Sequence, residues 1–391
     1  MSAEAFLAAI EANPADDTIR LVYADWLDEH GDHDRAAFIR AQIEMDPLEE
    51  DDPRRVELNA RAEALLEARR AEWLGPLVEA APDDRWGFRR GMPEELNFVG
   101  GEINDEGVAA LAESPHLARL STLCLNLCFI GPAGAISLAS SPHLAHLRSL
   151  TIIGGRFGAA GASAILHSPH LIRLTELNLQ WAEIGADIAP AFSDSPRLNE
   201  LTSLLLQGNR IGNRGVSALA TSQHTGRLTE LHLGKNGIKS RGAAALASSQ
   251  FLKNLKALVL DDNDICDSGV TALSASPYMA QLCDLLLSKT GIGNAGARAL
   301  AASAYLGNLR FLTLSGNKIG DEGIIALASS PHFSRLTFLD LSTNEFGDAG
   351  AMALATSRHL SDSLHLVCFQ DSLTWESSKA LKERFRQDLA E

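Results

Sequence analysis

The chain repeats itself every 27 residues over most of its length. Leucine stands at 120 and at every 27th residue up to 336, and a second leucine column runs from 96 to 339. An apolar residue follows each leucine of the second column two positions later. This alternation predicts a short strand with one buried face. One such unit cannot bury its own apolar surface, so the period indicates a solenoid whose neighbouring units stack on a shared core.

Each unit continues with a turn and a helix. Ile or Phe recurs five positions after the strand motif, a Gly-rich turn follows, and an Ala-rich segment ends at a serine. We interpret this serine column, from 114 to 357, as the marker of each helix end. Two units show the whole strand-and-turn pattern: Leu231-x-Leu233-x-x-Asn236-x-Ile238 and Leu312-x-Leu314-x-x-Asn317-x-Ile319-Gly320.

That pattern resembles the L-x-x-L-x-L-x-x-N-x-I core of the leucine-rich repeat. The unit length and the Gly-x-x-x-Leu segments that start at Gly323 and Gly350 are similar to those of the ribonuclease-inhibitor-like subclass, which includes the Ran GTPase-activating protein. The resemblance covers residues 93–362, about ten units. It implies an α/β fold, a leucine-rich-repeat solenoid with a parallel β-sheet on its concave face and helices on its convex face. It names no partner.

An asparagine column is expected to hold the turns together. Asn209, Asn236, Asn263, Asn317 and Asn344 occupy a position where a side-chain amide can bond backbone groups that the turn leaves unpaired. The same position holds residues without an amide in the other units: Gly101, Cys128, Gly155, Ala182 and Thr290. We therefore predict that the first four units are less regular than the rest.

Residues 1–92 are predicted to form a small all-α domain of their own. Capping and breaking residues place a first helix from Ser2 to about 11, a break at Asn13-Pro14, a second helix from 16 or 17 to Gly31, a third around 37–43 and a fourth from about Pro53 to Trp73. The second helix carries one apolar stripe: Ile19, Val22, Tyr23, Trp26 and Leu27. Residues 4–46 resemble the short bacterial repeat-companion domain that precedes repeat arrays, a resemblance that implies an architecture and no activity.

Both ends of the array are expected to carry caps, because an open end would expose apolar core and an unpaired strand edge. Trp73 and Trp86-x-Phe88 are predicted to cover the first end. Residues 363–391 are predicted to cover the second, with a strand at Leu364-x-Leu366 and a helix from Thr374 to about 389. The residues of that helix expected to face the stack are Trp375, Leu381, Phe385 and Leu389.

Charge argues against nucleic acid and anionic membranes as partners, since both require a basic face. The net charge is −16, and residues 1–90, with 22 acidic and 11 basic side chains, account for −11 of it. The five cysteines form no C-x-x-C pair, and the first residues do not resemble a secretory signal, so we expect a cytoplasmic protein. The resemblance to the companion domain implies that the protein is bacterial. Residues 120–142 lack charged side chains but keep the repeat register, so we expect them to form part of the repeats rather than a membrane-spanning helix.

No catalytic residue, metal or cofactor is predicted. The chain has no P-loop, G-x-S-x-G or H-E-x-x-H motif, and its cysteines lie in repeats or in the closing strand. Zinc needs three or four convergent ligands, so the 27-residue spacing of His116, His143 and His170 favours packing or surface roles. An acidic run consists of Asp25, Asp28, Glu29, Asp32 and Asp34. It lacks the spacing of a calcium-binding loop, and we interpret it as a solvated helix end that forms salt bridges with Arg20, Arg35 and Arg40.

The candidate binding surface is the concave wall, where side chains between the buried leucines point outward. Leu205, Val259, Leu286, Phe311 and Phe338 are expected to form a contiguous solvent-facing strip rimmed by carboxylates, as protein interfaces are. The alternative is that they pack on one another as ordinary β-surface. The other candidate partner-binding residues are Trp181, His232, Asp261, Asp262, Asp264, Asp284 and Asp340.

The sequence therefore predicts a non-enzymatic protein-protein interaction module that binds a protein partner, without nucleic acid or membrane partners. Two alternatives stay open. A GTPase-activating role, resting on similarity to the Ran activator, predicts nucleotide-dependent binding of a small GTPase along the acidic rim. An enzyme hidden in residues 1–92 requires a pocket and perturbed carboxylates near Asp25 and Asp28.

Overall fold

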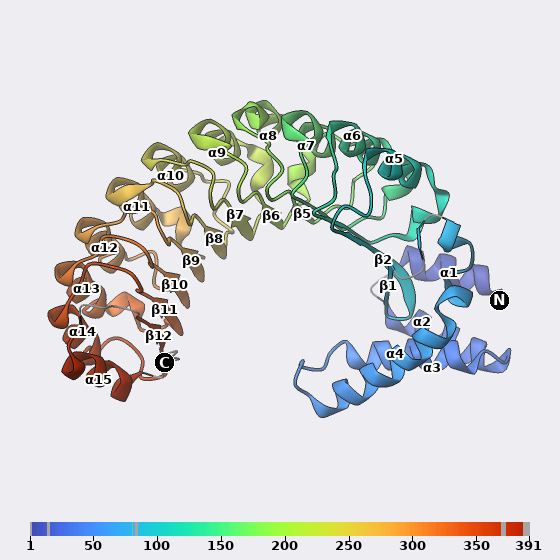
Figure 1. The fold of residues 1–391 in the computed structure, drawn as a ribbon, viewed down its shortest axis with the longest axis horizontal. Helices are drawn as coiled ribbons and strands as arrows, with labels where there is room; N and C mark the ends of the chain where they lie inside the picture. Colours follow the sequence, from blue (N-terminus) through green and yellow to red (C-terminus); the bar gives the residue numbers. More distant parts are fainter. Residues whose placement is uncertain (1, 14–15, 80, 83–84, 369–372, 386–391) are drawn as a thin grey trace.

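The chain forms an open arch in which strands line the inner side and helices cover the outer side (Figure 1). The computed structural model describes residues 2–13, 16–79, 81–82, 85–368 and 373–385. The N-terminal helices stand at one end of the arch and α15 stands at the other (Figure 1). The predicted α/β solenoid preceded by an all-α region is confirmed.

One sheet of twelve strands, in chain order, runs the length of the arch. From β2 to β12 every neighbouring pair is parallel, and residues 27 apart stand opposite each other, as Leu231 and Leu258 do. β1 is antiparallel to β2. The strands are β1 (Trp86–Arg89), β2 (Met92–Val99), β3 (Thr122–Asn126), β4 (Ser149–Ile153), β5 (Glu176–Asn178), β6 (Ser203–Leu205), β7 (Glu230–His232), β8 (Ala257–Val259), β9 (Asp284–Leu286), β10 (Phe311–Thr313), β11 (Phe338–Asp340) and β12 (His365–Val367).

Four helices precede the sheet, and one helix follows each strand from β2 to β12. The first four are α1 (Ala3–Ala12), α2 (Asp17–Glu29), α3 (His33–Met45) and α4 (Pro53–Leu74). The others are α5 (Asp105–Glu113), α6 (Pro132–Ser140), α7 (Gly158–Leu166), α8 (Ala189–Asp194), α9 (Gly212–Thr221), α10 (Ser240–Ala247), α11 (Cys266–Ser274), α12 (Asn294–Ala301), α13 (Asp321–Ala328), α14 (Asp348–Ala355) and α15 (Trp375–Arg384). Short 3₁₀ helices are η1 (Gly75–Glu79), η3 (Pro115–Arg119), η4 (Pro142–Leu144), η5 (Ala186–Ile188), η6 (Pro196–Asn199), η7 (Gln223–Thr225), η8 (Pro277–Met279) and η9 (Pro331–Phe333).

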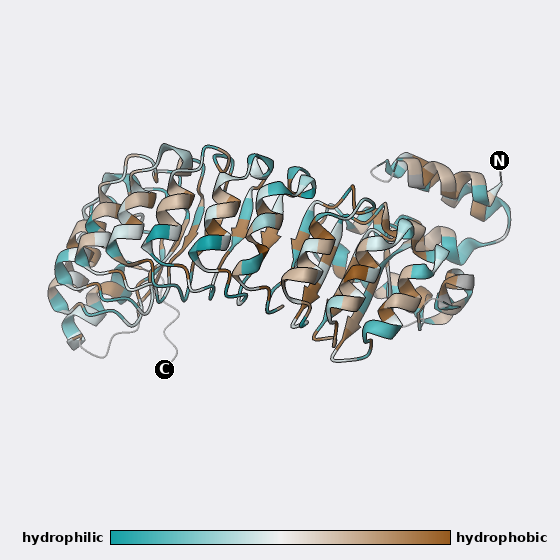
Figure 2. Ribbon diagram, turned by 90° about the horizontal axis from the view of Figure 1, so that it is seen from above, coloured by the Kyte–Doolittle hydropathy of each residue, from teal (hydrophilic) through white to brown (hydrophobic). Residues whose placement is uncertain are grey.

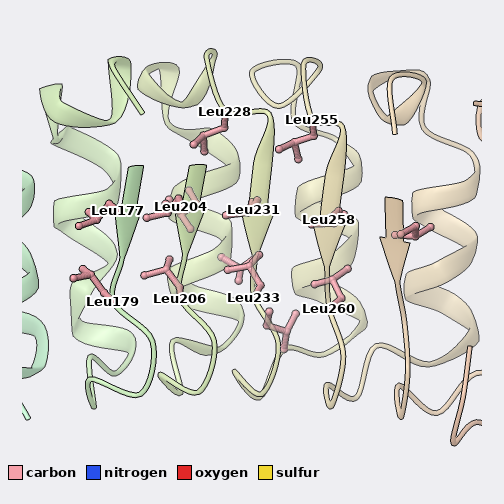
Figure 3. Close-up of a cluster of buried hydrophobic side chains, with 14 of the residues drawn as sticks. Leu177, Leu179, Leu204, Leu206, Leu228, Leu231, Leu233, Leu255, Leu258 and Leu260 are labelled. Carbon is pink, nitrogen blue, oxygen red and sulfur yellow. The ribbon is translucent and has the colours of Figure 1, made fainter. Parts of the chain in front are cut away.

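The leucine columns fill the space between the sheet and the helices. Figure 3 shows Leu204, Leu231 and Leu258 pointing from their strands toward the helices behind them. Leu258 is 0% exposed, and the apolar side chains of all the units join into one continuous core. The visible strands include brown segments in Figure 2, and the helices mix brown and teal. Burying one leucine stabilises the fold by ~1.5–3 kcal/mol, which is why the register holds through the whole array.

The asparagine column bonds backbone groups of two units at once. Asn263 Nδ2 donates to the carbonyl oxygens of Leu233 and Leu260, each at 2.9 Å. Its Oδ1 accepts from the backbone N–H groups of Asn236 and Ile238 at 3.1 and 2.9 Å. The early units, which lack this amide, differ from the later ones: β3 and β4 have five residues instead of three, and α8 has only six. The first units are thus built differently, as the missing asparagines predict.

Most helices are capped by a side chain of the preceding unit, which the sequence did not lead us to expect. Asp267 Oδ1 accepts the backbone N–H groups of Gly293 and Gly296 at 2.7 and 2.8 Å. These N–H groups lie at the start of α12, where the helix has no carbonyl partner for them. Equivalent bonds come from Asp105, Asn213, Asn294, Asp321 and Asp348, whereas Pro132, Ala159 and Ala186 hold the same position without an acceptor.

The serine column also ties the units together. Ser303 Oγ donates to the carbonyl oxygen of Ser274, and Ser330 Oγ donates to that of Ala301, both at 2.6 Å. Each acceptor lies at the end of the helix of the preceding unit, where carbonyl groups lack intrahelical partners. The interpretation of these serines as markers of helix ends was therefore correct but incomplete.

The N-terminal helices begin where the sequence places them. The side chains of Ser2 and Asp16 accept the first backbone N–H groups of α1 and α2. Pro14 of the predicted break lies outside the described residues.

The apolar stripe of α2 is narrower than predicted. Tyr23 and Leu27 are buried, and Ile19 and Trp26 pack against the same cluster. Val22, which we predicted to share this stripe, is 48% exposed. The buried residues of α2 are Arg20, Tyr23, Ala24 and Leu27. Val22 lies one helical step of about 100° from Tyr23, on the side away from the other buried residues, and is therefore outside the packed face.

The acidic run pairs with one of the three predicted arginines. Arg40 contacts the carboxylates of Asp25 and Asp28, each at 2.6 Å, and these hydrogen bonds hold the pKa of Asp28 below its ordinary value. The prediction was wrong for Arg20 and Arg35. Both turn away from the run, toward β2 and the turn between β1 and β2.

A β-hairpin closes the first end of the sheet. Its turn, Arg90 and Gly91, has φ values of 47° and 82°, the left-handed pair typical of two-residue hairpin turns. Trp86 is 2% exposed and joins the core of the repeats, while Trp73 packs against the cluster between α3 and α4. β1 belongs to the sheet of the repeats although it lies before residue 92, and a domain boundary at 92 stays a prediction.

The second end is closed by β12 and α15. Leu381 and Phe385 are 1% and 2% exposed and reach the core, as predicted. The prediction for Trp375 was wrong: this side chain is 72% exposed, because it stands on the outer side of α15 with Lys379 Nζ 5.0 Å from its ring centroid. Leu389 lies outside the described residues.

Candidate interaction surface on the concave wall

Two rows of side chains face the hollow of the arch, one on each side of the buried leucine of every strand. Neighbours in a row stand on adjacent parallel strands, about 4.8 Å apart. The first row reads Ser203, Glu230, Ala257, Asp284, Phe311, Phe338 and His365. The second row reads Leu205, His232, Val259, Leu286, Thr313, Asp340 and Val367.

Three rings of the first row form one stack. The ring centroids of Phe311 and Phe338 are 4.0 Å apart with an interplanar angle of 3°, and His365 continues the stack at 5.3 Å and 7°. The rings therefore cover each other's faces and turn their edges to the hollow. The sequence analysis missed His365, which it assigned to the cap, although His365 stands 27 residues after Phe338.

The second row is not the continuous apolar strip that we predicted. Leu205 and Leu286 are half-buried, but Val259 is only 7% exposed. It stands between His232 and Leu286, whose side chains are longer, on the adjacent strands. The apolar surface is therefore divided into Leu205 at one side and the group of Leu286, Phe311 and Phe338 at the other.

Two carboxylates stand near the rings in the strand register. Asp284 stands beside Phe311 on the adjacent strand, and Asp340 lies two residues after Phe338. Partial burial raises the pKa of Asp284 above its ordinary value, and Arg310 opposes that rise. Farther along the rows, Glu230 accepts from Ser203 Oγ at 2.7 Å and lies 2.8 Å from His232 Nε2.

The three aspartates after β8 do not act as one acidic group. Asp261 is half-buried and accepts the backbone N–H of Ser288 at 2.6 Å, and burial raises its pKa. Asp262 is exposed and lies 3.9 Å from Lys235 Nζ. Asp264 is exposed as well. The last two carboxylates are therefore more accessible to a partner than Asp261, although Asp264 Oδ1 also accepts from Cys266 Sγ at 3.1 Å.

Trp181 belongs to a column with left-handed backbone that the sequence analysis missed. A Cβ on Gly208 would lie 2.4 Å from a ring carbon of Trp181, so the indole lies flat on that glycine. Lys235 Nζ is 5.4 Å from the ring centroid, and Trp181 is 44% exposed. The column has φ between 51° and 76° and consists of Gly100, Leu127, Gly154, Trp181, Gly208, Lys235, Asp262, Lys289, Gly316 and Thr343.

Other kinds of site find little support in the described part of the chain. No group of three His, Cys, Asp or Glu side chains there could hold a metal ion, and no helix there is long and apolar enough to cross a bilayer. Burial raises the pKa of Cys124 and Cys128, and raises that of Cys368 to about 12, the opposite of what a nucleophilic thiol requires.

Comparison with known proteins bears on the fold. The Leucine Rich repeat family model matches residues 94–112, 199–220, 228–247, 251–274, 308–328 and 335–355. No curated protein sequence matches the chain. Similar solved structures include an internalin (inlF) of Listeria monocytogenes, with 20% identity, a TM-score of 0.49 and coverage of 76% of this chain and 87% of the internalin chain. A chain of the Rad7 and Elc1 complex of yeast has 16% identity, a TM-score of 0.40 and coverage of 95% and 96%.

The matched repeats and the observed sheet together define the fold. The chain contains leucine-rich repeats that stack into one solenoid.

Proposed function

We propose that the chain is a non-enzymatic protein-binding module that holds its partner on the group of Leu286, Phe311 and Phe338, which we call the concave strip. The supporting observation is the ring stack, whose edges face the hollow from three adjacent strands. These side chains stand on the opposite side of the sheet from the leucine core. Apolar side chains grouped on an accessible surface are typical of protein-binding sites.

The surroundings of the concave strip indicate the chemistry of the partner. Asp284 and Asp340 place carboxylates beside the rings, so the strip has an apolar centre and an anionic rim. Protein interfaces commonly combine these two features. The complementary surface is an apolar knob ringed by Lys or Arg, with the charges guiding association and the rings supplying contact area.

We also propose that the repeats belong to the ribonuclease-inhibitor-like subclass and that residues 1–92 form a repeat-companion domain of a bacterial cytoplasmic protein. The 27-residue period with one helix in nearly every unit supports the subclass. The four helices before β1 support the companion domain.

The proposal is tested by the double substitution Phe311→Ala with Phe338→Ala. Truncating hot-spot aromatic residues costs ~2 kcal/mol or more of binding free energy, so the variant should lose the partners that the wild type captures from a native lysate of its source cells. Mass spectrometry of the captured proteins measures the loss. Circular dichroism of the variant checks that the array still folds.

Phe129→Ala is the matched control, because Phe129 is 79% exposed but lies outside the two concave rows. It should retain every partner. If the double variant keeps the same partners at comparable yield, the concave strip is not the recognition surface. The convex helices or residues 1–92 then become the candidates.

A further inference from the structure

A cavity of about 970 Å³ lies between the N-terminal helices and the first repeats, away from the concave strip. Leu7 and Ile10 of α1, Tyr23 of α2 and Met92 of the hairpin contribute apolar surface to its wall. The residues just before β3, β4 and β5 contribute the opposite side. Asp25 and Asp28, the two carboxylates that an enzyme in residues 1–92 would require near a pocket, do not line this cavity.

The charge of this cavity is opposite to that of the chain. Seven arginines and three carboxylates line it, in a protein whose net charge is −16. Each carboxylate already has a partner. Glu94 lies 3.1 Å from Arg20 Nη2, Glu72 lies 2.8 Å from Arg69 Nη1, and Asp32 caps α3 by accepting a backbone N–H at 3.1 Å.

Arg35 is a buried cation with an open donor in this wall. It is 7% exposed, and its Nη2 donates to the carbonyl oxygen of Gly91 at 2.8 Å. Its guanidinium carbon stands 4.8 Å from the ring centroid of Trp73. Within the described residues its Nη1 has no hydrogen-bond partner. Burial lowers the pKa of Arg35 to about 10, so the side chain is still charged at neutral pH. A buried charge with an unused donor is costly unless an acceptor meets it.

The mouth of the cavity carries further arginines at repeat positions. Arg119 and Arg173 occupy one repeat column with His146 between them, and Arg148 stands two residues after His146. All three arginines are exposed. Among the described residues, no carboxylate lies within ion-pair distance of Arg148 or Arg173.

We propose that this cavity binds a small organic anion, a molecule that carries a phosphate or carboxylate group on an apolar body. The anionic group meets Arg35 and the arginines of the mouth, and the body lies against Leu7, Ile10 and Met92. Guanidinium groups bind both kinds of anion through paired, charge-assisted hydrogen bonds. The cavity lies where two parts of the fold meet and has the size of a small-molecule site, which favours a small ligand over an extended one.

The test uses the full chain and the fluorescent aryl sulfonate 8-anilinonaphthalene-1-sulfonate as the probe. We expect saturable binding that phenyl phosphate or benzoate displaces and that the uncharged analogue benzyl alcohol does not. The stronger of the two anions identifies the group that the site prefers. Equal displacement by benzyl alcohol would mean that only apolar contacts hold the probe, and the proposal would fail.

Arg148→Gln with Arg173→Gln should weaken probe binding about tenfold, the loss expected from one strong charge-assisted hydrogen bond. The matched control is Arg310→Gln with Arg335→Gln, since these exposed arginines occupy the same two repeat columns six units later. The control should bind within about twofold of the wild type. Equal affinities in the two double variants would overturn the proposal.

Arg35→Met tests the buried donor. Phenyl phosphate should raise the melting temperature of the wild type, because a ligand bound only by the folded state stabilises it, and should leave that of Arg35→Met unchanged. If Arg35→Met does not fold, the two arginine pairs decide the question alone. An equal shift in wild type and a folded Arg35→Met would remove Arg35 from the site.

Discussion

The first units of the array and the later ones share a leucine core but hold their turns differently. From Asn209 onward, amides bond the turns of all units but that of Thr290, and Asp or Asn side chains cap the helix of the next unit in all cases but that of Ser240. Between β3 and β5 the same two positions hold Cys, Gly, Ala or Pro. There β3 and β4 pair over five residues, which extends the backbone ladder toward the turn. Apolar burial and the serine bonds are thus common to the whole array, whereas the amide bonds and the helix caps between units belong mainly to its later part.

The largest effect should come from the shared core. Leu150→Ala and Leu258→Ala each leave a cavity at a fully buried position and should each lower the free energy of unfolding by ~2–5 kcal/mol. Urea denaturation measures both, with the half-exposed Cys124→Ser as a nearly neutral control. A much smaller loss for Leu150→Ala would show that the two parts do not share one kind of core.

The next effect separates the two parts. Asn263→Ala removes five hydrogen bonds and leaves buried backbone groups without partners, at a cost of ~2–4 kcal/mol. Cys128→Ala, at the same position of an early unit, removes a small side chain whose sulfur makes only weak hydrogen bonds, such as the one to the carbonyl oxygen of Asn126 at 3.6 Å, and should cost about 1 kcal/mol. Equal losses in urea denaturation would mean that the amide bonds do not distinguish the later units.

The capping bonds should have a smaller, local effect. Asp267→Ala removes the acceptor for two N–H groups at the start of α12 and should cost about 1 kcal/mol. Hydrogen exchange should show faster exchange at residues 293–297 and none of this change near α7. Asp264→Ala, which removes an exposed carboxylate nearby, is the control and should leave α12 protected.

The smallest effect should depend on pH. Hydrogen bonds from Ser377 and Thr374 hold the pKa of Asp348 below its ordinary value of 3.8. Because the folded-state pKa is lowered, the stabilisation is present above about pH 4 and is lost as the pH falls through the lowered value. Thermal unfolding between pH 7 and pH 2.5 should show this loss for the wild type, and Asp348→Asn should weaken it. The same pH response in both proteins would assign it to other carboxylates.

The strands, the helices and the core leucines could be predicted from the sequence because period and hydrophobicity are local properties that recur. The caps supplied by Asp267 or Asp321 could not, since each bond joins residues of two units whose relative placement only the folded stack defines. The candidate site shows the same limit. The row positions of Phe311 and Phe338 follow from the register, but the burial of Val259 depends on the length of its neighbours in space.

The left-handed column limits which residues each unit can exchange. At Gly208 a side chain would meet the indole of Trp181, and at Gly316 it would meet Lys289, so in these two pairs the glycine makes room for the side chain of the preceding unit. Substitutions at these glycines therefore require a smaller residue in the preceding unit. The hydrogen bonds between units also join residues at nearly constant sequence separations. After the loss or duplication of 27 residues, each donor and acceptor therefore still finds an equivalent partner in the neighbouring unit. Such an array can gain or lose whole units without a new core. The width of the open side of the arch in Figure 1 changes with the number of units.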